Sequence, residues 1–326
     1  MLLLTKAIFA IMIGFLSSAV LGLILIPILK KLKMGQKISA FVGEAHRKKE
    51  GTPTIGGLIF IIPTIAATIF LILTNKIPYT ANLGIVLLVF LGYACIGFLD
   101  DFLSIRRAQN EGLTTYQKLI MQVLIAIGFF YIYMRNGGQT SWVVGTLHID
   151  LEMGWLYGLF ILFVLVGASN AVNLTDGLDG LAGGLSAIAY IAFALISLTV
   201  GFEDIGIFSL ILVGSLMGYL IYNTHPAKVI MGDTGSLALG ATMGAIAILT
   251  HRELTLLVVA GIFVIETLSV IIQTFWVQVF HRKLFLMTPI HHHFEKLGWA
   301  ETDIVKLFWV GGLLLAMAGI IFGVWL

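Results

Sequence analysis

Two neighbouring carboxylates, Asp100 and Asp101, stand at the end of an apolar run in the segment IGFLDDFLSIRR (96–107). A charged side chain inside a bilayer is costly, so a pair of acids at this depth needs a chemical reason. Adjacent residues on a helix point about 100° apart, so the two acids cannot hold one ion symmetrically. One would face an ion and the other a second partner. The alternative is a solvated helix end with Arg106 and Arg107 as counter-charges.

A second pair of acids, Asp176 and Asp179, lies in NAVNLTDGLDGLAGG (170–184). A spacing of three residues places both side chains on one face of a helix. The neighbouring glycines are also typical of turns, in which the two aspartates would be simple turn and cap residues. The motif by itself leaves both interpretations open.

Asp233 stands between glycines in MGDTGS (231–236), just before a further apolar run. The glycines allow the backbone to approach another group closely, and we expect Thr234 or Ser236 to cap the helix that follows. A helix N-terminus favours anions such as phosphate. The simpler alternative is an ordinary N-cap without a ligand.

Three consecutive histidines, His291, His292 and His293, occur in TPIHHHFEKLG (288–298). Consecutive side chains cannot all face one way in regular structure, so we do not expect a metal triad from them. We expect one or two of them to contact phosphate and the third to be structural, with a solvated loop as the alternative. Glu266 lies inside an apolar segment, where an acid is either functional or a hydrogen-bonded interior residue.

These segments offer carboxylates, amides and lysines on loops that flank apolar runs. The residues are Asp100, Asp101, Asp176, Asp179, Asp233, Asn170, Asn173, Asn223, Lys48, Lys49 and Lys118. Oxygen ligands without thiolates favour Mg²⁺, which usually completes its shell with substrate phosphates. Lysines and histidines stabilise phosphate charge in a transition state. The motifs therefore indicate phosphoryl transfer at a membrane surface. The absence of a Walker A loop and of GxGxxG gives no support to an ATPase or a dinucleotide-binding fold.

The elements that carry these motifs are very apolar. The 326 residues are 59% hydrophobic and 11% charged, with a mean hydropathy of +1.03. A spanning helix needs roughly 20 apolar residues, so we predict an all-α, polytopic transmembrane bundle of about ten helices, forming one domain over 1–326. The expected helices are 4–29, 54–74, 82–100, 116–134, 153–170, 180–200, 205–222, 236–250, 254–280 and 305–325. The stretch 141–152 alternates around Gly145 and Thr146 and predicts a small outer hairpin.

Lysine and arginine are distributed unevenly between the two sides of this bundle. A basic cluster at 30–33 follows the first helix, which places the N-terminus outside and the next loop in the cytoplasm. Alternation from there leaves fifteen of the 19 basic residues on the inner side. The outer side keeps Lys6, Lys76, Arg135 and Arg252. We therefore predict that both termini lie outside and that all the polar clusters converge on one cytoplasmic site.

Five motifs occur in the order known from one enzyme family: GTPTIGG, FLDDFL, NAVNLTDGLDGLAGG, MGDTGSLALGA and TPIHHHFE. On these motifs, and nearly end to end, the chain resembles the polyprenyl-phosphate N-acetylhexosamine-1-phosphate transferases. The triple histidine after TPI favours the members that act on UDP-MurNAc-pentapeptide. The resemblance implies Mg²⁺-dependent transfer of phospho-MurNAc-pentapeptide from this donor to undecaprenyl phosphate, giving lipid I and UMP. The alternative is a sister transferase that moves GlcNAc-1-phosphate from UDP-GlcNAc.

The resemblance also implies ten transmembrane helices in the bacterial plasma membrane, a homodimer, and a cleft that faces the cytoplasm. No nucleic-acid partner is expected. Asp233 would be the metal ligand, and Asp100 and Asp101 would be the acids nearest the reacting phosphates. Asp100 is favoured to deprotonate the lipid phosphate. His291 and His292 would contact the pyrophosphate or the sugar-peptide part.

The remaining substrate contacts implied by the resemblance are polar side chains from four segments. The nucleotide end would be lined by Asn170, Asn173 and Asp176, with Asn223 nearby. Further polar contacts would come from Thr54, Lys118 and Lys49, or Lys48 in place of Lys49.

The polyprenyl tail requires an apolar groove. Segment 254–280 would supply one wall of it by breaking near Glu266 and leaning outward.

A secondary transporter is the main alternative of another class, but its site would lie near the membrane midplane rather than at one edge.

Overall fold

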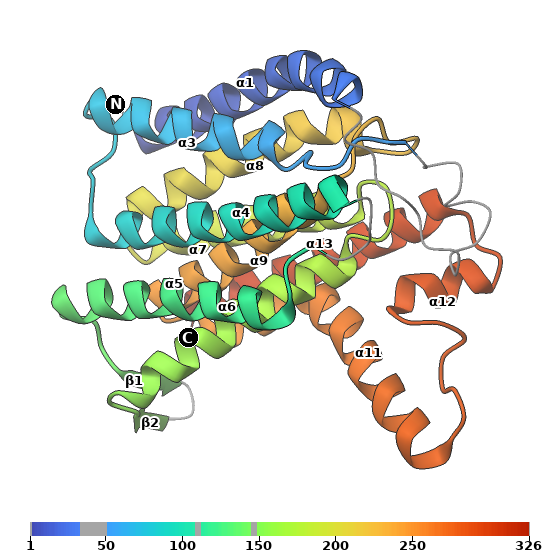
Figure 1. Cartoon of the computed structure of the whole chain (residues 1–326). Helices are drawn as coiled ribbons and strands as arrows, with labels where there is room; N and C mark the ends of the chain where they lie inside the picture. Colours follow the sequence, from blue (N-terminus) through green and yellow to red (C-terminus); the bar gives the residue numbers. More distant parts are fainter. Residues whose placement is uncertain (1, 33–50, 108–111, 145–148, 326) are drawn as a thin grey trace.

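The computed structural model describes residues 2–32, 51–107, 112–144 and 149–325. Within these residues the chain forms a bundle of helices and one small hairpin (Figure 1). The helices are α1 (Leu3–Lys31), α3 (Leu58–Leu73), α4 (Ala81–Arg107), α5 (Thr115–Arg135), α6 (Leu156–Thr175), α7 (Leu181–Thr199), α8 (Glu203–Asn223), α9 (Gly232–Leu249), α10 (Glu253–Val259), α11 (Gly261–Phe280), α12 (Ile290–Lys296) and α13 (Glu301–Trp325). In this described part, nine helices are long and apolar enough to cross a membrane, and α3 is shorter at 16 residues. The predicted all-α, polytopic bundle is confirmed, and each of the ten predicted segments overlaps at least one of these helices, although several helices extend beyond the predicted bounds.

The hairpin follows α5 and consists of β1 (Ser141–Val144) and β2 (Ile149–Glu152). The strands are antiparallel, with Ser141 opposite Glu152 and Val144 opposite Ile149. This confirms the hairpin predicted over 141–152, while its turn at Gly145 and Thr146 lies outside the described residues. Figure 1 places the hairpin at the end of the bundle away from α12.

The core of the bundle is formed by α7, α8 and α9, in which most residues are buried. By contrast, α1, α5, α11 and α13 keep many large apolar side chains exposed on one side. A helix that is apolar all round is stable when protein covers it or when lipid surrounds it. The exposed apolar faces of the outer helices therefore fit a bilayer environment.

The predicted spanning segment 254–280 is divided into two helices, α10 and α11, by Ala260. Figure 1 shows α11 leaning away from the rest of the bundle. The outward lean agrees with the prediction, but the position of the break does not, since α11 runs through Glu266 without interruption. The helix is interrupted instead at Ala260, directly before Gly261, and glycine weakens a helix interior.

The polar motifs gather at one end of this bundle. That end is formed by the last turns of α4 and α6, the first turns of α5 and α9, and the short helix α12. Figure 1 shows these helix termini on the side opposite to the hairpin. The helices therefore bring together segments that are far apart in the sequence.

Candidate active site

The first turn of α9 is the centre of the site, and a carboxylate from another helix caps it. Asp101, on α4, is only 6% exposed. Its Oδ1 accepts the backbone N–H of Asp233 at 3.1 Å, and its Oδ2 accepts the backbone N–H and the hydroxyl of Thr234 at 3.0 and 2.6 Å. The N–H groups of a first helical turn lack intrahelical partners and carry partial positive charge, so an anion here is stabilised.

This contact corrects the predicted capping of α9. We expected Thr234 or Ser236 to act as the cap, but the hydroxyl of Thr234 donates to Asp101 and that of Ser236 donates to the carbonyl of Gly232. Both residues lie inside the helix, where their side chains cannot occupy the N-cap position. Asp101 supplies the missing acceptor from α4.

The close contact between α4 and α9 depends on Gly97. A Cβ atom on this residue would lie 2.1 Å from the backbone oxygen of Asp233 and 2.5 Å from the backbone nitrogen of Thr234. Backbone atoms at such distances cannot yield without moving the helix. We therefore expect Gly97 to be required for the contacts of Asp101.

Gly97→Ala is expected to lower the free energy of unfolding by about 1–3 kcal/mol, because a methyl group would force α4 and α9 apart. Activity should fall with it, since Asp101 and Asp233 would separate. Thermal unfolding and turnover in detergent measure both effects. The control is Gly128→Ala, where the nearest atom to a new Cβ is a side-chain carbon at 3.3 Å. Equal stability of the two variants would contradict this role of Gly97.

Asp100 points away from Asp101 and toward α5, as the 100° separation of adjacent residues predicts. Its Oδ1 accepts the backbone N–H of Leu113 at 2.7 Å and lies 3.0 Å from the Nζ of Lys118. The same Nζ donates to the Oδ2 of Asp233 at 2.9 Å. Lys118 therefore bridges the carboxylates of Asp100 and Asp233, and all three side chains are partly exposed.

Asn173, near the end of α6, completes this cluster. Its amide group donates to the Oδ1 of Asp233 at 2.7 Å and contacts the Oγ of Ser236 at 2.9 Å. Both oxygens of Asp233 are thus held by neighbouring side chains. The structure brings together Asp100, Asp101, Asp233, Lys118 and Asn173 from four helices.

Thr54 lies on the buried side of the same cluster. Residues 53–57 run beside the start of α9, with backbone hydrogen bonds from Ile230 to Pro53, from Gly56 to Ile230 and from Gly57 to Met231. Thr54 is 1% exposed, and a Cβ on Gly232 would lie 2.7 Å from its hydroxyl oxygen. Lys49 and Lys48, predicted in the preceding loop, lie outside the described residues.

Three other predicted residues lie apart from this cluster. Asn170 is exposed and donates to the carbonyl of Val166 in its own helix. Asp176 is the C-cap residue of α6. Asn223 is 4% exposed and uses its amide to hold backbone groups, accepting the N–H of Gly180 and donating to the carbonyl of Val229.

Asp176 and Asp179 do not share a helical face, because α6 ends at Thr175 and α7 begins at Leu181. The turn interpretation of NLTDGLDG is therefore correct, and the helical one is wrong. The glycines of the motif end the helix early. Asp179 instead accepts the backbone N–H of Ala227 and lies 3.0 Å from the Nδ1 of His225.

Glu301, at the start of α13, joins this second polar group. Its Oε1 accepts the backbone N–H of Asp179 at 2.6 Å, and its Oε2 lies 3.5 Å from the Nδ1 of His225. Asp179, His225 and Glu301 place one ligand atom each within 4.8 Å of one another. Reasoning from the sequence missed this group, because Glu301 follows Asp179 by more than a hundred residues and no motif connects them.

The three histidines on α12 face three different environments, as predicted. His291 is fully buried, and its Nδ1 lies 3.1 Å from the Oε1 of Glu266 on α11. His292 is half-buried, and its Nδ1 lies 2.5 Å from an oxygen of Glu295. His293 accepts the backbone N–H of Leu286. Glu266 is therefore a hydrogen-bonded interior acid.

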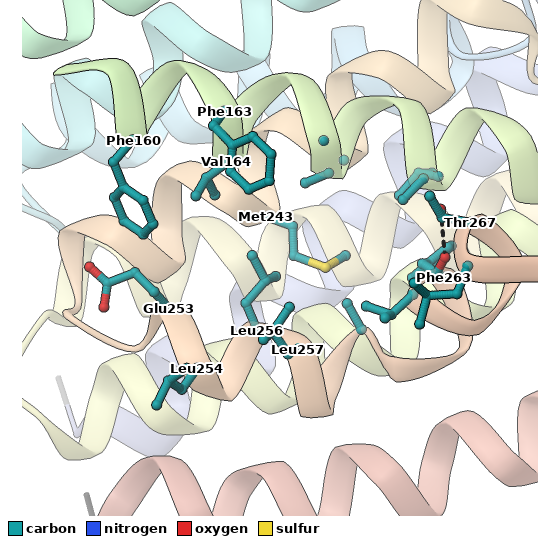
Figure 2. Close-up of a pocket in the computed structure, with 18 residues that line it drawn as sticks. Phe160, Phe163, Val164, Met243, Glu253, Leu254, Leu256, Leu257, Phe263 and Thr267 are labelled. Carbon is teal, nitrogen blue, oxygen red and sulfur yellow. Dashed lines mark hydrogen bonds between the residues drawn. The ribbon is translucent and has the colours of Figure 1, made fainter. Parts of the chain in front are cut away.

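An apolar cavity of ≈ 460 Å³ lies between α6, α9, α10 and α11 (Figure 2). It extends from Ala171 and Val172, next to Asn173, to Glu253 at its far end. Figure 2 shows Phe160, Phe163 and Met243 on its walls, and the hydroxyl of Thr267 turned toward the carbonyl of Phe263. Gly240 on α9 also lines the cavity, about 10 Å along the helix from Asp233 at 1.5 Å per residue. The end of the cavity at Ala171 and Val172 is thus the end nearer to the polar cluster, although none of the cluster residues lines the cavity.

Comparisons with known proteins show the family of this chain. The model of the family described as Glycosyl transferase family 4 matches residues 83–251, which include Asp100, Lys118, Asn173 and Asp233. Relatives named phospho-N-acetylmuramoyl-pentapeptide-transferase match almost the whole chain.

Among these relatives, the protein of Bacillus subtilis (strain 168) is 47% identical over 319 residues, and that of Bacillus licheniformis is 46% identical over 319 residues, each covering 98% of both chains. The protein of Geobacillus thermodenitrificans is 45% identical over 318 residues, covering 97% of this chain and 98% of its own. The chain therefore belongs to the phospho-N-acetylmuramoyl-pentapeptide-transferase family, and the predicted resemblance is confirmed.

Proposed function

We propose that this protein transfers phospho-MurNAc-pentapeptide from UDP-MurNAc-pentapeptide to undecaprenyl phosphate, giving lipid I and UMP, in the first membrane step of peptidoglycan synthesis. The observation that carries the proposal is the linked cluster of Asp100, Lys118, Asp233 and Asn173, at the end of the bundle toward which the apolar cavity extends. A water-soluble nucleotide and a membrane-bound phosphate can meet only where such a polar site borders lipid. Kinship with the transferase family supports the same reaction.

The reaction requires two anionic substrates to approach each other. At 4 Å, two unit charges repel by about 4 kcal/mol at an effective dielectric of 20, so fixed positive charge is needed. Lys118 supplies an ammonium group, but it is paired with Asp100 and Asp233, and the first turn of α9 is capped by Asp101, so a bound cation would supply the further positive charge. Asp100, which has one oxygen near this lysine, would accept the proton of the lipid phosphate.

In the chemical step, an oxygen of the lipid phosphate forms a bond to the phosphorus that carries the sugar. The bond from that phosphorus to the bridging oxygen breaks, and UMP leaves with this oxygen. The side chain of Asn173 keeps Asp233 oriented at 2.7 Å during these events. Lys118 remains close enough to stabilise negative charge as it shifts.

We propose Mg²⁺ as the cofactor, on the chemistry of the donor set. Asp100 and Asp233 already direct oxygens at one positive charge, the Lys118 ammonium, at 3.0 and 2.9 Å. Carboxylate oxygens at a phosphate site are the ligands Mg²⁺ prefers, whereas the imidazole in the Asp179 group is better suited to transition metals. Asp233 would hold the ion with Asp100 beside it. When bound, Mg²⁺ would neutralise phosphate charge.

The remaining substrate contacts and the setting also form part of the proposal. Thr54, Asn170, Asp176, Asn223 and His292 would position the donor directly or through the loops they hold. Lys49 would contribute from the first inner loop. The chain would form a single membrane domain over 1–326 and pair as a homodimer. The uneven distribution of lysine and arginine between the two sides of the bundle supports a site that faces the cytoplasm, with both termini outside.

A comparison of UDP-MurNAc-pentapeptide with UDP-GlcNAc as the donor tests this function with purified protein in detergent. We expect UMP release from UDP-MurNAc-pentapeptide only when both Mg²⁺ and undecaprenyl phosphate are present. UDP-GlcNAc should give little or no release under the same conditions. Preference for UDP-GlcNAc would favour the sister transferase, and release that does not depend on the lipid phosphate would contradict the proposed reaction.

A further inference from the structure

Glu266 and His291 form a buried pair that the proposed reaction has not yet used. Both side chains are fully buried, and the Nδ1 of His291 lies 3.1 Å from the Oε1 of Glu266. The contact joins α12 to the first part of α11, a helix that otherwise leans away from the bundle. In the tautomer that carries its proton on Nδ1, the imidazole donates a hydrogen bond to the Oε1 of Glu266.

The other ring nitrogen of His291 faces the turn between α6 and α7. A Cβ on Gly177 would lie 2.3 Å from this Nε2, so only glycine allows the ring to lie so close. Within the described part of the chain, neither the Nε2 of His291 nor the Oε2 of Glu266 has a hydrogen-bond partner. Gly177 directly follows Asp176, which we place at the nucleotide end of the site.

The tautomer of His291 determines how much free energy it costs to pack its ring against Gly177. A proton on Nε2 would be a buried donor directed at the turn, without an acceptor among the described residues. With the proton on Nδ1, the edge that faces the turn is a lone pair, which is less costly to leave unpaired. A carboxylate that accepts from the opposite ring nitrogen fixes this tautomer and the orientation of the ring.

We infer that Glu266 is a positioning residue for the transferase. It fixes His291, and His291 in turn supports the turn around Gly177 that places Asp176 against the nucleotide of the donor. The inference rests on the proposed function and gives His291 a positioning role rather than direct contact with the reacting phosphates. Loss of the pair should therefore weaken binding of the donor more than it slows the chemical step.

The test compares Glu266→Leu with Glu266→Gln. Glutamine retains an oxygen that can accept from Nδ1, whereas leucine does not. We expect Glu266→Leu to raise the KM for UDP-MurNAc-pentapeptide by about 10–100-fold with little change in kcat, and Glu266→Gln to raise it much less. The Tm of the leucine variant should fall, because the buried Nδ1–H of His291 loses its acceptor, so KM is compared at a temperature at which all variants remain folded.

Gly177→Ala provides a second, independent variant. Its new Cβ would displace the ring of His291, so it should also raise the KM, and the double variant with Glu266→Leu should be no worse than the more severe single one. Thr274→Ala, on the exposed side of α11 with its hydroxyl donating to the carbonyl of Val270, is the control. Calorimetric binding of UMP should give the same ranking of variants without any turnover.

Two results would overturn the inference. One is an unchanged KM and UMP affinity in Glu266→Leu. The other is an equal increase of KM in the leucine and glutamine variants, with activity decreasing in proportion to Tm. A residue with a purely structural role would give that result. Failure of the proposed function would be a separate result, in which the wild-type protein releases no UMP. The calorimetric measurement of UMP binding would still decide the role of Glu266.

Discussion

Asp233→Asn is expected to reduce Mg²⁺-dependent UMP release by about 10²–10³-fold or more while the protein remains folded. Both oxygens of Asp233 are in use, one accepting from Asn173 and one from Lys118. An asparagine would remove the negative charge and would direct an N–H group at one of these donors. Turnover assays together with thermal unfolding in detergent measure the two expectations.

Asp303→Asn is the matched control for this variant. Asp303 lies at the same end of the bundle, its side chain is 63% exposed, and its ion pair with Lys306 is long, at 3.5 Å. An exposed pair of this kind contributes little, so the control should keep wild-type activity and stability. If Asp233→Asn retained activity within tenfold of the control, the assignment of Asp233 to the metal and phosphate site would be wrong.

Asp100→Asn and Asp101→Asn are expected to have different effects, one mainly on turnover and the other mainly on stability. Asp101 holds the start of α9 through contacts with the backbone of Asp233 and with Thr234. Its replacement should lower the free energy of unfolding by at least about 2 kcal/mol, because hydrogen bonds to a buried charge are lost. Asp100→Asn should retain stability, since its side chain is partly exposed, but should lose turnover.

Thermal unfolding separates these two variants, and UMP release shows whether Asp100→Asn is inactive although folded. Asp101→Asn should lose activity in parallel with stability, and stabilising conditions such as lower temperature should restore part of it. Similar losses of Tm in both variants would contradict the division of roles. Separate roles would then not explain why Asp100 and Asp101 are adjacent.

The positions of the helices could be predicted because a bilayer leaves few alternatives. Backbone groups inside lipid must be paired within helices or closed barrels, so long apolar runs specify helices directly. The hairpin over 141–152 was likewise predictable from its alternation. The break at Ala260 was not predictable, because two small residues in an apolar run are not a distinctive pattern. The break was predicted near Glu266 instead, because an acid is unusual in such a run.

The site could be predicted as a set of residues but not as a set of contacts. The capping of α9 by Asp101 joins residues 132 positions apart, and only the packing of α4 against α9 creates it. Local rules favoured Thr234 or Ser236, which are the usual capping types. Asn223 illustrates the same limit, since its amide looks suited to a ligand but is held by backbone groups of two loops.

The apolar cavity has a consequence for how the two substrates arrive. Several of its wall residues, such as Phe163 and Leu257, are also exposed on the lipid-facing surface of the bundle. On the proposed function, the acceptor could slide in sideways from the leaflet, while the nucleotide docks from water. The long isoprenoid chain would then never leave its hydrocarbon surroundings, and encounter rates would depend on the density of acceptor within the membrane rather than on its solubility.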